Sequence, residues 1–382
     1  VPVVSSWLSR DKGAAYGAYT MRWLLAALVL CSTVFSGGDV SLERLHPLLG
    51  DGIVKTLLAA VPGMGAVWGV VLLELFPLRR GSPEPGSRGK RKDWLFIAVP
   101  LFCCVLWGSA FPCVKIAYPL FKISDTGSQI LFAGVRFFIS GIITFIVGCI
   151  LEKRILRVRK LSIPGIIRQG LLQTTIQYTC FHISLAYISS SESAIINASN
   201  VFISVIAAHF LLKNERLSWE TIFGCIAGLA GVILINLTGI LNGSFSFRGE
   251  GLMLAAAASY GISNVYLKKI VKQESPMAIT SYQILFGSLL MIIIGICMGG
   301  RVQVYSLKAA CLLLYLAALS AAAFSIWTLL LKYNPVGKVT MFAFSIPVFG
   351  VIMSGIFLGE SVFSVKNIIA LVLVSVGIGV VN

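Results

Sequence analysis

The chain is poor in charge, and above all in negative charge. Only 12% of its 382 residues are charged, with 15 acidic against 31 basic residues. A soluble domain carries about 25% charged residues, because its surface needs polar cover. At 57% apolar residues, a water-soluble globule of this length is excluded, and the composition predicts a polytopic membrane protein.

Motifs of catalysis and of cofactor or metal binding are also missing. The sequence contains no HExxH, no G-x-S-x-G, no nucleotide-binding loop and no aspartate pair within an apolar run. Its nine cysteines form no CxxC pair and no Cys/His zinc spacing, so we interpret them as packing residues. We therefore expect no enzyme activity, no cofactor and no metal. The positive charge lies mostly between apolar runs, so nucleic acid is not an expected partner.

Long apolar runs dominate the chain from residue 94 onward. Ten of them are long enough to cross the hydrocarbon core as helices, which takes about 20 residues, and none alternates as a membrane strand does. Their predicted limits are 94–117, 130–151, 165–188, 191–212, 218–238, 250–270, 276–298, 307–330, 335–358 and 361–381. The predicted fold class is all-α, with ten transmembrane helices.

Residues 1–90 form an N-terminal extension that is open to two interpretations. The run 23–36 is short for a span and resembles the apolar part of a signal peptide, whereas 53–76 is long enough to cross. A polar linker rich in Pro, Gly and Ser follows. The extension is either genuine, with one or two further helices, or the result of a start placed too far upstream.

Basic residues are distributed unevenly between alternate connections. If residue 92 is cytoplasmic, the connections on that side hold most of them, among them Lys153, Arg154, Arg157, Arg159, Lys160, Lys268, Lys269, Lys272, Lys332 and Lys338. The opposite side holds fewer: Lys115, Lys122, Arg248, Arg301, Lys308 and Lys366. Because cytoplasmic loops carry an excess of Lys and Arg, we expect a plasma-membrane protein with a cytoplasmic C-terminus.

The ten-helix region repeats a sequence pattern. The stretch "LWGSAFPCVK" (106–115) corresponds to "SYGISNVYLK" (259–268), and "VRFFISG" (135–141) corresponds to "YQILFGS" (282–288). A glutamate also follows the fourth apolar run of each half. The common order of these matches predicts that one unit occurs twice.

The repeat unit has five helices, over residues 91–240 and again over 248–382. Because five is odd, the second copy enters the membrane from the opposite side. This predicts an inverted repeat, with Glu215 at the cytoplasmic face and Glu360 at the outer face. Inverted repeats of this kind are characteristic of secondary transporters.

On these residues the chain resembles the EamA-type transporters of the drug/metabolite transporter superfamily. The resemblance covers about 94–382 and lies in the L-x-x-E-x-x-S turn after the fourth helix, the glycine-rich fifth helix ending in Asn, and the WG…K pattern of the first. It implies transport of small metabolites, often amino acids or related solutes, and often outward.

The resemblance also implies a proline about thirteen residues before each glutamate. Pro347 has this place before Glu360, but Phe202 has it before Glu215. Since proline interrupts a helix, we expect a straighter fourth helix in the first half. Glu215, Glu360 and Pro347 are interpreted as structural residues at the membrane interface.

Polar side chains inside a membrane need a partner or a water-filled cavity. Those of the third, fourth and sixth runs recur at helical spacing, and aromatic and amide groups of other runs can join them. We predict a midplane solute cavity lined by Trp107, Arg136, Gln173, Gln177, Asn197, Asn200, Tyr260, Asn264, Gln283 and Trp327. Alternatively, the amides only hold helices together.

Arg136 is the most informative of these residues, because a cation costs about 2.5–3.5 kcal/mol at the centre of a membrane helix. It can bind a substrate carboxylate or phosphate. It can instead extend to the interface, or hold a carbonyl group or Glu192. Glu192 in turn can carry a coupling proton, pair with Arg136, or compensate the charge of a helix N-terminus.

The sequence thus predicts a secondary transporter that exports amino acids or related small metabolites by alternating access. The alternatives are a membrane-embedded sensor, or a carrier for sugar phosphates, purines or drugs. The expected partners are the lipid bilayer and a small-molecule substrate, and coupling to a proton or ion gradient is a further alternative.

Overall fold

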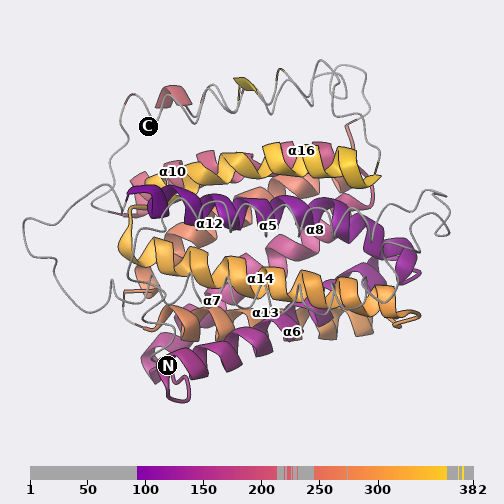
Figure 1. Ribbon diagram of the computed structural model, residues 1–382, viewed down its shortest axis with the longest axis horizontal. Helices are drawn as coiled ribbons and strands as arrows, with labels where there is room; N and C mark the ends of the chain where they lie inside the picture. Colours follow the sequence, from indigo (N-terminus) through magenta and orange to yellow (C-terminus); the bar gives the residue numbers. More distant parts are fainter. Residues whose placement is uncertain are drawn as a thin grey trace, which may run out of the picture. The chain divides into compact units, whose positions relative to one another are not determined.

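The computed structural model describes residues 93–212 and 245–358 except 273, with isolated positions between 219 and 230 and between 369 and 373. Over these ranges the chain is helical and contains no strand (Figure 1). The extension 1–90 and the predicted helices 218–238 and 361–381 lie outside this part of the chain, apart from the isolated positions. Glu215 and Glu360 lie outside it too.

Four predicted helices of the first half are described. The first two are continuous, whereas the third and fourth are interrupted. Their bounds are α5 (Asp93–Leu120), α6 (Thr126–Glu152), η2 (Lys160–Ser162) with α7 (Ile163–Gly170), the π-helical η3 (Leu171–Ile176) and α8 (Gln177–Leu185), and finally α9 (Ser190–Asn197) with α10 (Ser199–Leu211).

Four predicted helices of the second half are also described, and they follow the same order. Their bounds are η4 (Phe247–Gly251) with α12 (Leu252–Ile270), α13 (Pro276–Cys297), α14 (Leu307–Tyr333), and α15 (Val336–Thr340) with the 3₁₀ segment η5 (Met341–Phe344) and α16 (Ser345–Leu358). Eight of the ten apolar runs therefore coincide with helical structure.

Six membrane-competent helices occur in the described part of the chain. By length and hydropathy, the spans are Ala98–Leu120, Thr126–Glu152, Ser190–Leu211, Pro276–Cys297, Leu307–Tyr333 and Val336–Gly355. The all-α, polytopic character of the fold is confirmed to this extent, while the full set of ten helices stays a prediction.

Helix starts follow from polar residues that cap free main-chain N–H groups. Asp125 accepts hydrogen bonds from the main-chain N and the Oγ of Ser128, at 2.8 and 2.6 Å. Ser275 and Ser306 cap α13 and α14 in the same way. Such caps satisfy donors that have no partner within the first turn of a helix.

The second and seventh predicted helices, α6 and α13, form an antiparallel pair. Three glycines of α6 lie against α13 along its length: Gly134 faces Ile292, Gly141 faces Leu285 and Gly148 faces Met277. A Cβ at Gly134 would lie 2.8 Å from the main-chain N of Ile292, so the two helices approach too closely for a side chain there. Small residues allow such approach between membrane helices.

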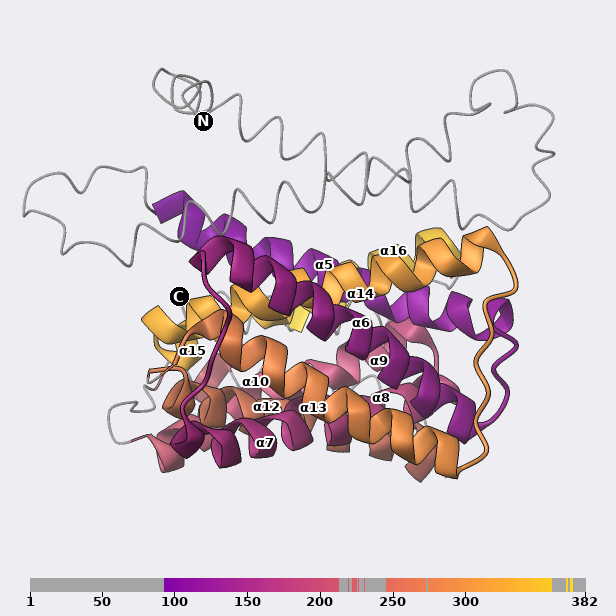
Figure 2. The same cartoon turned by 90° about the horizontal axis from the view of Figure 1, so that it is seen from below.

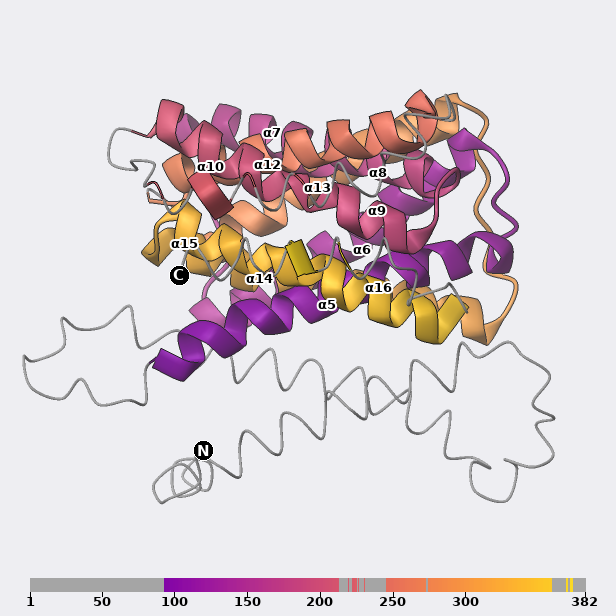
Figure 3. The ribbon, with the colours of Figure 1, turned by 90° about the horizontal axis from the view of Figure 1, so that it is seen from above.

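The first and sixth helices make corresponding contacts. α5 packs on α14 and α16, whereas α12 packs on α8 and α10 (Figure 3). A Cβ at Gly108 of α5 would lie 2.7 Å from Phe349 of α16. A Cβ at Gly261 of α12 would lie 2.8 Å from the carbonyl oxygen of Asn200 in α10. Each helix is thus closely packed on the fourth helix of the other half.

The connections gather at two opposite ends, as Figure 2 shows for 121–125 and 298–306 at one end and 153–159 at the other. We name them the Asp125 end and the Glu274 end. At the Asp125 end, the main-chain N of Arg301 donates to Ser128 Oγ at 2.9 Å. Because this joins the start of α6 to the residues after α13, the two helices run in opposite directions.

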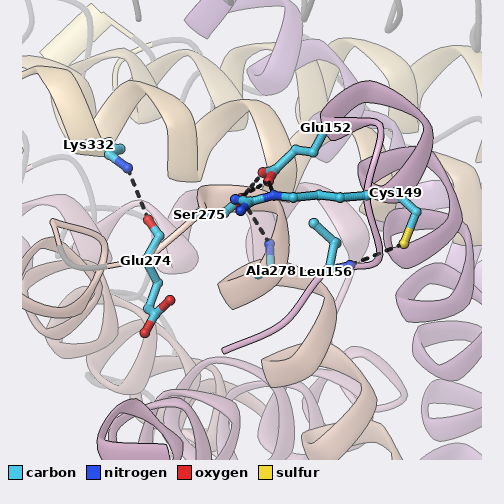
Figure 4. Close-up of polar contacts among 8 residues, drawn as sticks. Cys149, Glu152, Leu156, Glu274, Ser275, Ala278 and Lys332 are labelled. Carbon is cyan, nitrogen blue, oxygen red and sulfur yellow. Dashed lines mark hydrogen bonds and ion pairs between the residues drawn. The ribbon is translucent and has the colours of Figure 1, made fainter. Parts of the chain in front are cut away.

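The Glu274 end is held by acidic residues (Figure 4). The Glu274 carboxylate accepts hydrogen bonds from Arg159 Nε at 2.9 Å and Ser162 Oγ at 2.6 Å, and its side chain is only 8% exposed. Lys332 Nζ donates to the Glu274 carbonyl oxygen at 3.0 Å. Glu152, at the end of α6, accepts from Ser275 Oγ.

These contacts lower the pKa of Glu274. Burial alone raises it, but hydrogen bonds from Ser162 and Arg159 and the charge of Arg159 outweigh burial. The Glu274 end also carries most of the basic residues of the described connections, as the sequence analysis expects.

Candidate functional site

One cavity lies where the first, second, third, fourth, sixth and ninth helices meet. The cavity is small in this conformation, with a volume of about 30 Å³. Half of the residues predicted to bind solute line it, namely Trp107, Arg136, Gln177, Asn197 and Tyr260. The remaining lining residues, which the sequence analysis did not single out, are Ala110, Phe111, Tyr178, Phe181 and Ile346.

Arg136 supplies the positive charge of this cavity. It is 1% exposed, so its side chain is enclosed by other residues of the protein. Its Nη2 donates to Ser320 Oγ of α14 at 3.0 Å, and its Cζ lies 4.4 Å from the centre of the Phe137 ring. Its Nε and Nη1 have no hydrogen-bond partner among the described residues. Glu192 is not among its described contacts.

Two amides line the cavity, and both lie at helix interruptions. Gln177 directly follows the π-helical segment η3, and Asn197 is the last residue of α9. Within the described part of the chain, Gln177 Oε1 and Asn197 Oδ1 accept no hydrogen bond. The cavity therefore combines unpaired donors on Arg136 with unpaired acceptors on the amides.

The interruption beside Asn197 arises without proline. Ser199 Oγ donates to the carbonyl oxygen of Ile196 at 2.8 Å, and Asn200 Nδ2 donates to that of Asn197. Such side chains compete with main-chain hydrogen bonds and favour a helix break. The interruption of the fourth helix is one residue, Ala198, whose φ and ψ stay in the right-handed helical region, whereas the 3₁₀ segment before Pro347 spans four residues. The straighter course expected of the fourth helix stays a prediction.

Aromatic rings form the remaining walls. Trp107 packs edge-on against Tyr260, Phe324 and Trp327, with ring centres 6.0, 5.5 and 5.0 Å apart. On another side, Phe111 and Phe181 pack edge-to-face at 5.2 Å. The ring faces carry partial negative charge, so they favour a cationic group or an apolar body in the cavity.

Comparison with known proteins shows the family of this chain. The model of the EamA-like transporter family matches residues 94–237 and again 247–382. The chain belongs to the EamA-like transporter family. The resemblance stated from the sequence is thereby confirmed, and the family indicates a membrane transporter.

Relatives of this EamA protein include proteins that are named as transporters. YvbV of Bacillus subtilis, named as an uncharacterized transporter, is 27% identical over 285 residues, which cover 74% of this chain and 89% of YvbV. A chloroplastic WAT1-related protein of Arabidopsis thaliana is 24% identical over 78% of this chain and 71% of its own. A protein of known crystal structure matches 75% of this chain and 95% of its own, with TM-score 0.58 and 18% identity, which shows the fold alone.

Other predicted binding residues of the EamA protein lie outside the cavity lining. Trp327 Nε1 donates to Asn264 Oδ1, and Asn264 Nδ2 donates to Ser204 Oγ, each at 3.3 Å. These contacts join α14, α12 and α10. Asn200 Nδ2 bonds within its own helix. Asn264 and Trp327 thus hold the helices behind the lining.

Gln173 and Gln283 belong to a separate cluster with Gln169. Gln173 Oε1 accepts hydrogen bonds from Gln169 Nε2 at 2.7 Å and from Gln283 Nε2 at 2.8 Å. All three side chains are fully buried. Glu192 lies in the first turn of α9, where its charge meets the positive end of the helix dipole.

Contacts of Arg136 that sequence reasoning missed are Phe137, Tyr178 and Ser320. Tyr178 neighbours the predicted Gln177, but aromatic residues are too frequent in this chain for adjacency to single one out. Ser320 lies in an alanine-rich stretch of α14 and carries no sequence signal. In the described part of the chain, no group of three His, Cys, Asp or Glu side chains is arranged to hold a metal ion.

Proposed function

We propose that this EamA protein transports zwitterionic metabolites that carry a carboxylate, amino acids being the first candidates, by alternating access. One observation carries the proposal: unpaired guanidinium donors of Arg136 and unpaired amide acceptors of Gln177 and Asn197 line the same cavity. A zwitterion supplies the acceptor and the donor that these groups lack.

The anionic part of the solute fits Arg136. A guanidinium binds a carboxylate through two parallel hydrogen bonds, and such charge-assisted bonds are about twice as strong as neutral ones. Ser320 and the Phe137 ring hold the guanidinium in place, while Nε and Nη1 have no other partner among the described residues. Removal from water strengthens the attraction.

The cationic part of the solute fits the hydrogen-bond acceptors and the aromatic faces of the same cavity. No carboxylate is among the lining residues of the cavity, so an ammonium group would be met by amide oxygens and aromatic faces. Gln177 and Asn197 offer the oxygens, and Trp107 offers the largest ring. The aromatic walls also favour an apolar body, which supports amino acids over sugar phosphates.

Alternating access follows from an inverted repeat of five helices, with the second copy reversed in the membrane. Two observations support it. α6 and α13 are antiparallel, and Gly108 and Gly261 pack on the fourth helix of the opposite half. If the two halves exchange conformations, one set of contacts serves a cavity open to either side.

The distribution of charge supports an orientation in the plasma membrane. The Glu274 end carries most of the described basic loop residues, so we place it in the cytoplasm. The predicted tenth helix, which lies outside the described residues apart from isolated positions, would bring the C-terminus to the same side. Export then moves solute from the Glu274 end to the Asp125 end.

Flux into proteoliposomes tests the proposal. Purified protein is reconstituted, and uptake of labelled L-phenylalanine, L-leucine and L-serine is measured for the parent, Arg136→Ala, Arg136→Lys and Asn197→Ala. Loss of a charge-assisted hydrogen bond predicts a rise in KM of about 10- to 100-fold for Arg136→Ala. Arg136→Lys keeps the charge but not the planar two-donor geometry, so its loss is smaller.

Arg157→Ala is the matched control, because Arg157 is exposed at the Glu274 end. It should transport like the parent. Transport by Arg136→Ala that equals the parent would show that Arg136 is structural. The absence of flux for all three amino acids would instead favour a sensor or another class of solute.

A further inference from the structure

The glutamine cluster of Gln169, Gln173 and Gln283 has hydrogen-bonding capacity that its internal bonds do not use. Gln169 Oε1, Gln173 Nε2 and Gln283 Oε1 have no partner in the described residues, although all three side chains are fully buried. An unpaired buried polar atom is costly, by about 1–3 kcal/mol each. The cluster therefore retains a capacity to bind that packing alone does not explain.

The sequence repeat makes the contact between Gln173 and Gln283 equivalent to the contact between Arg136 and Ser320. Aligning 135–141 with 282–288 places Arg136 and Gln283 at equivalent positions. The same difference of 147 in residue number also separates Gln173 from Ser320. The bonds correspond as well: Arg136 of α6 donates to Ser320 of α14, and Gln283 of α13 donates to Gln173 of η3.

The two contacts lie on opposite sides of the midpoint of the α6–α13 pair. Gly134 faces Ile292 and Gly141 faces Leu285. In this antiparallel register, the residue of α13 that lies opposite Arg136 is residue 290. Gln283 is seven positions away from residue 290 along α13. At 1.5 Å per residue this is about 10 Å along the helix axis. Arg136 is displaced toward the Asp125 end and Gln283 toward the Glu274 end.

We propose that Gln283, supported by Gln173, takes the place of Arg136 when the cavity opens at the Glu274 end, and so forms a second, uncharged station for the solute. This inference rests on the proposed function, because it requires that the two halves exchange conformations. The Gln283 amide donates to the carboxylate of the solute, and its oxygen accepts from the ammonium group.

The two stations differ in charge, and this has a consequence for the transport cycle. Arg136 binds the carboxylate as a cation, whereas Gln283 offers only a neutral donor. Affinity is therefore lower when the cavity opens at the Glu274 end than when it opens at the Asp125 end. The asymmetry lies within a pair of equivalent positions, so a single substitution that places a cation at Gln283 can remove it.

Transport measured from each side tests the inference. Right-side-out and inside-out membrane vesicles are prepared, and the KM of whichever amino acid of the panel the parent transports fastest is measured in both. Gln283→Met removes the hydrogen bonds and keeps an unbranched side chain. We expect the KM of Gln283→Met to rise about five-fold in one vesicle type only. This factor corresponds to the loss of one neutral hydrogen bond of about 1 kcal/mol, at 1.4 kcal/mol per tenfold change in KM.

Arg136→Lys should raise KM mainly in the opposite vesicle type. Gln283→Arg should lower KM in the vesicle type that Gln283→Met affects, because it places a cation at the second station. Thr280→Val is the matched control, because Thr280 lies on the same helix as Gln283. The substitution removes the buried hydrogen bond from Thr280 Oγ1 to Thr328 Oγ1 of α14, which is 2.8 Å long. It should alter stability without a difference between vesicle types.

The outcomes separate this inference from the proposed function. If Arg136 variants impair transport but Gln283→Met behaves like Thr280→Val, the second station is refuted and the function stands. If Gln283→Met raises KM equally in both types, Gln283 is a structural residue. If no Arg136 variant affects transport, the proposed function itself fails.

Discussion

Lys115 of α5 and Lys268 of α12 make the same kind of contact in the two halves of the chain. Each lies seven residues after a closely packed glycine, Gly108 or Gly261. Lys115 Nζ donates to the carbonyl oxygen of Ile188, just after the end of the third helix, at 2.9 Å. Lys268 Nζ donates to carbonyl oxygens at the end of α14, that of Leu331 at 2.7 Å and that of Asn334. A cation there meets the negative end of the helix dipole.

Removing this contact should destabilise the protein. Lys268→Met leaves carbonyl groups at the end of α14 without their donor, so we expect the free energy of unfolding to fall by about 1.5–3 kcal/mol. Thermal unfolding in detergent measures the change. Lys269→Met is the control, because Lys269 is exposed. Equal shifts for both variants would show that the contact of Lys268 contributes little.

Two glycine substitutions should change stability in opposite directions. Gly261→Ala places a Cβ 2.8 Å from the Asn200 carbonyl oxygen and 2.9 Å from the Ile203 side chain, so α12 and α10 must separate. We expect a loss of about 1–3 kcal/mol. Gly337→Ala in α15 meets no atom within 4 Å, and the higher helix propensity of alanine should add about 0.5–1 kcal/mol. A loss of stability in Gly337→Ala, or none in Gly261→Ala, contradicts the packing.

The two ends should be accessible from opposite sides of the membrane. Gln303→Cys introduces a thiol at the Asp125 end, and Lys272→Cys introduces one at the Glu274 end, in a background without reactive native cysteines. Given the excess of basic residues at the Glu274 end, a membrane-impermeant maleimide should label position 303 in intact cells. Position 272 should be labelled only after permeabilisation. Labelling of both positions in intact cells rules out the orientation.

Stability at the Glu274 end should depend on pH. The pKa of Glu274 lies below its ordinary value of 4.5, so the ionised form is bound more tightly in the folded protein. This contribution is fully present above pH of about 4.5 and is lost as pH falls through the lower, folded-state pKa. Thermal unfolding of the parent and of Glu274→Gln, compared at several pH values, should therefore differ most near neutral pH.

That difference should shrink as the pH is lowered below the ordinary pKa of glutamate, because the protonated carboxyl and the amide are then both neutral. A difference that stays constant over the whole range means that the charge of Glu274 does not contribute. The comparison needs only the parent and Glu274→Gln, because each serves as the reference for the other at every pH.

The positions of the eight predicted helices that the structure describes were predicted well, because hydropathy and length alone decide them in a membrane. The run 276–298, for example, coincides with α13. The interruptions were not predicted: neither the π-helical segment at 171–176 nor the break at Ala198 has a proline or a glycine run as its signal. Local bonds of Ser199 and Asn200, visible only in three dimensions, accompany the interruption at Ala198.

The cavity was predicted in part. Arg136 was found because a buried cation is rare and costly in any membrane helix. Gln173, Asn264 and Trp327 share the same sequence features as the lining residues, yet they bond to other helices. Periodicity places a side chain on a face of its helix, but it does not state which neighbour that face meets.

The sequence by itself determined that this chain is a polytopic membrane protein, because its scarcity of charge and its long apolar runs leave lipid as the suitable solvent. Its repeated motifs carried the resemblance to the EamA family, which the match of the family model confirms. Only the tertiary structure decided which polar groups share a cavity. The reason is that α5, α6, α8, α9 and α12 converge from distant parts of the chain, and the close packing of glycines such as Gly134 and Gly261 sets their register.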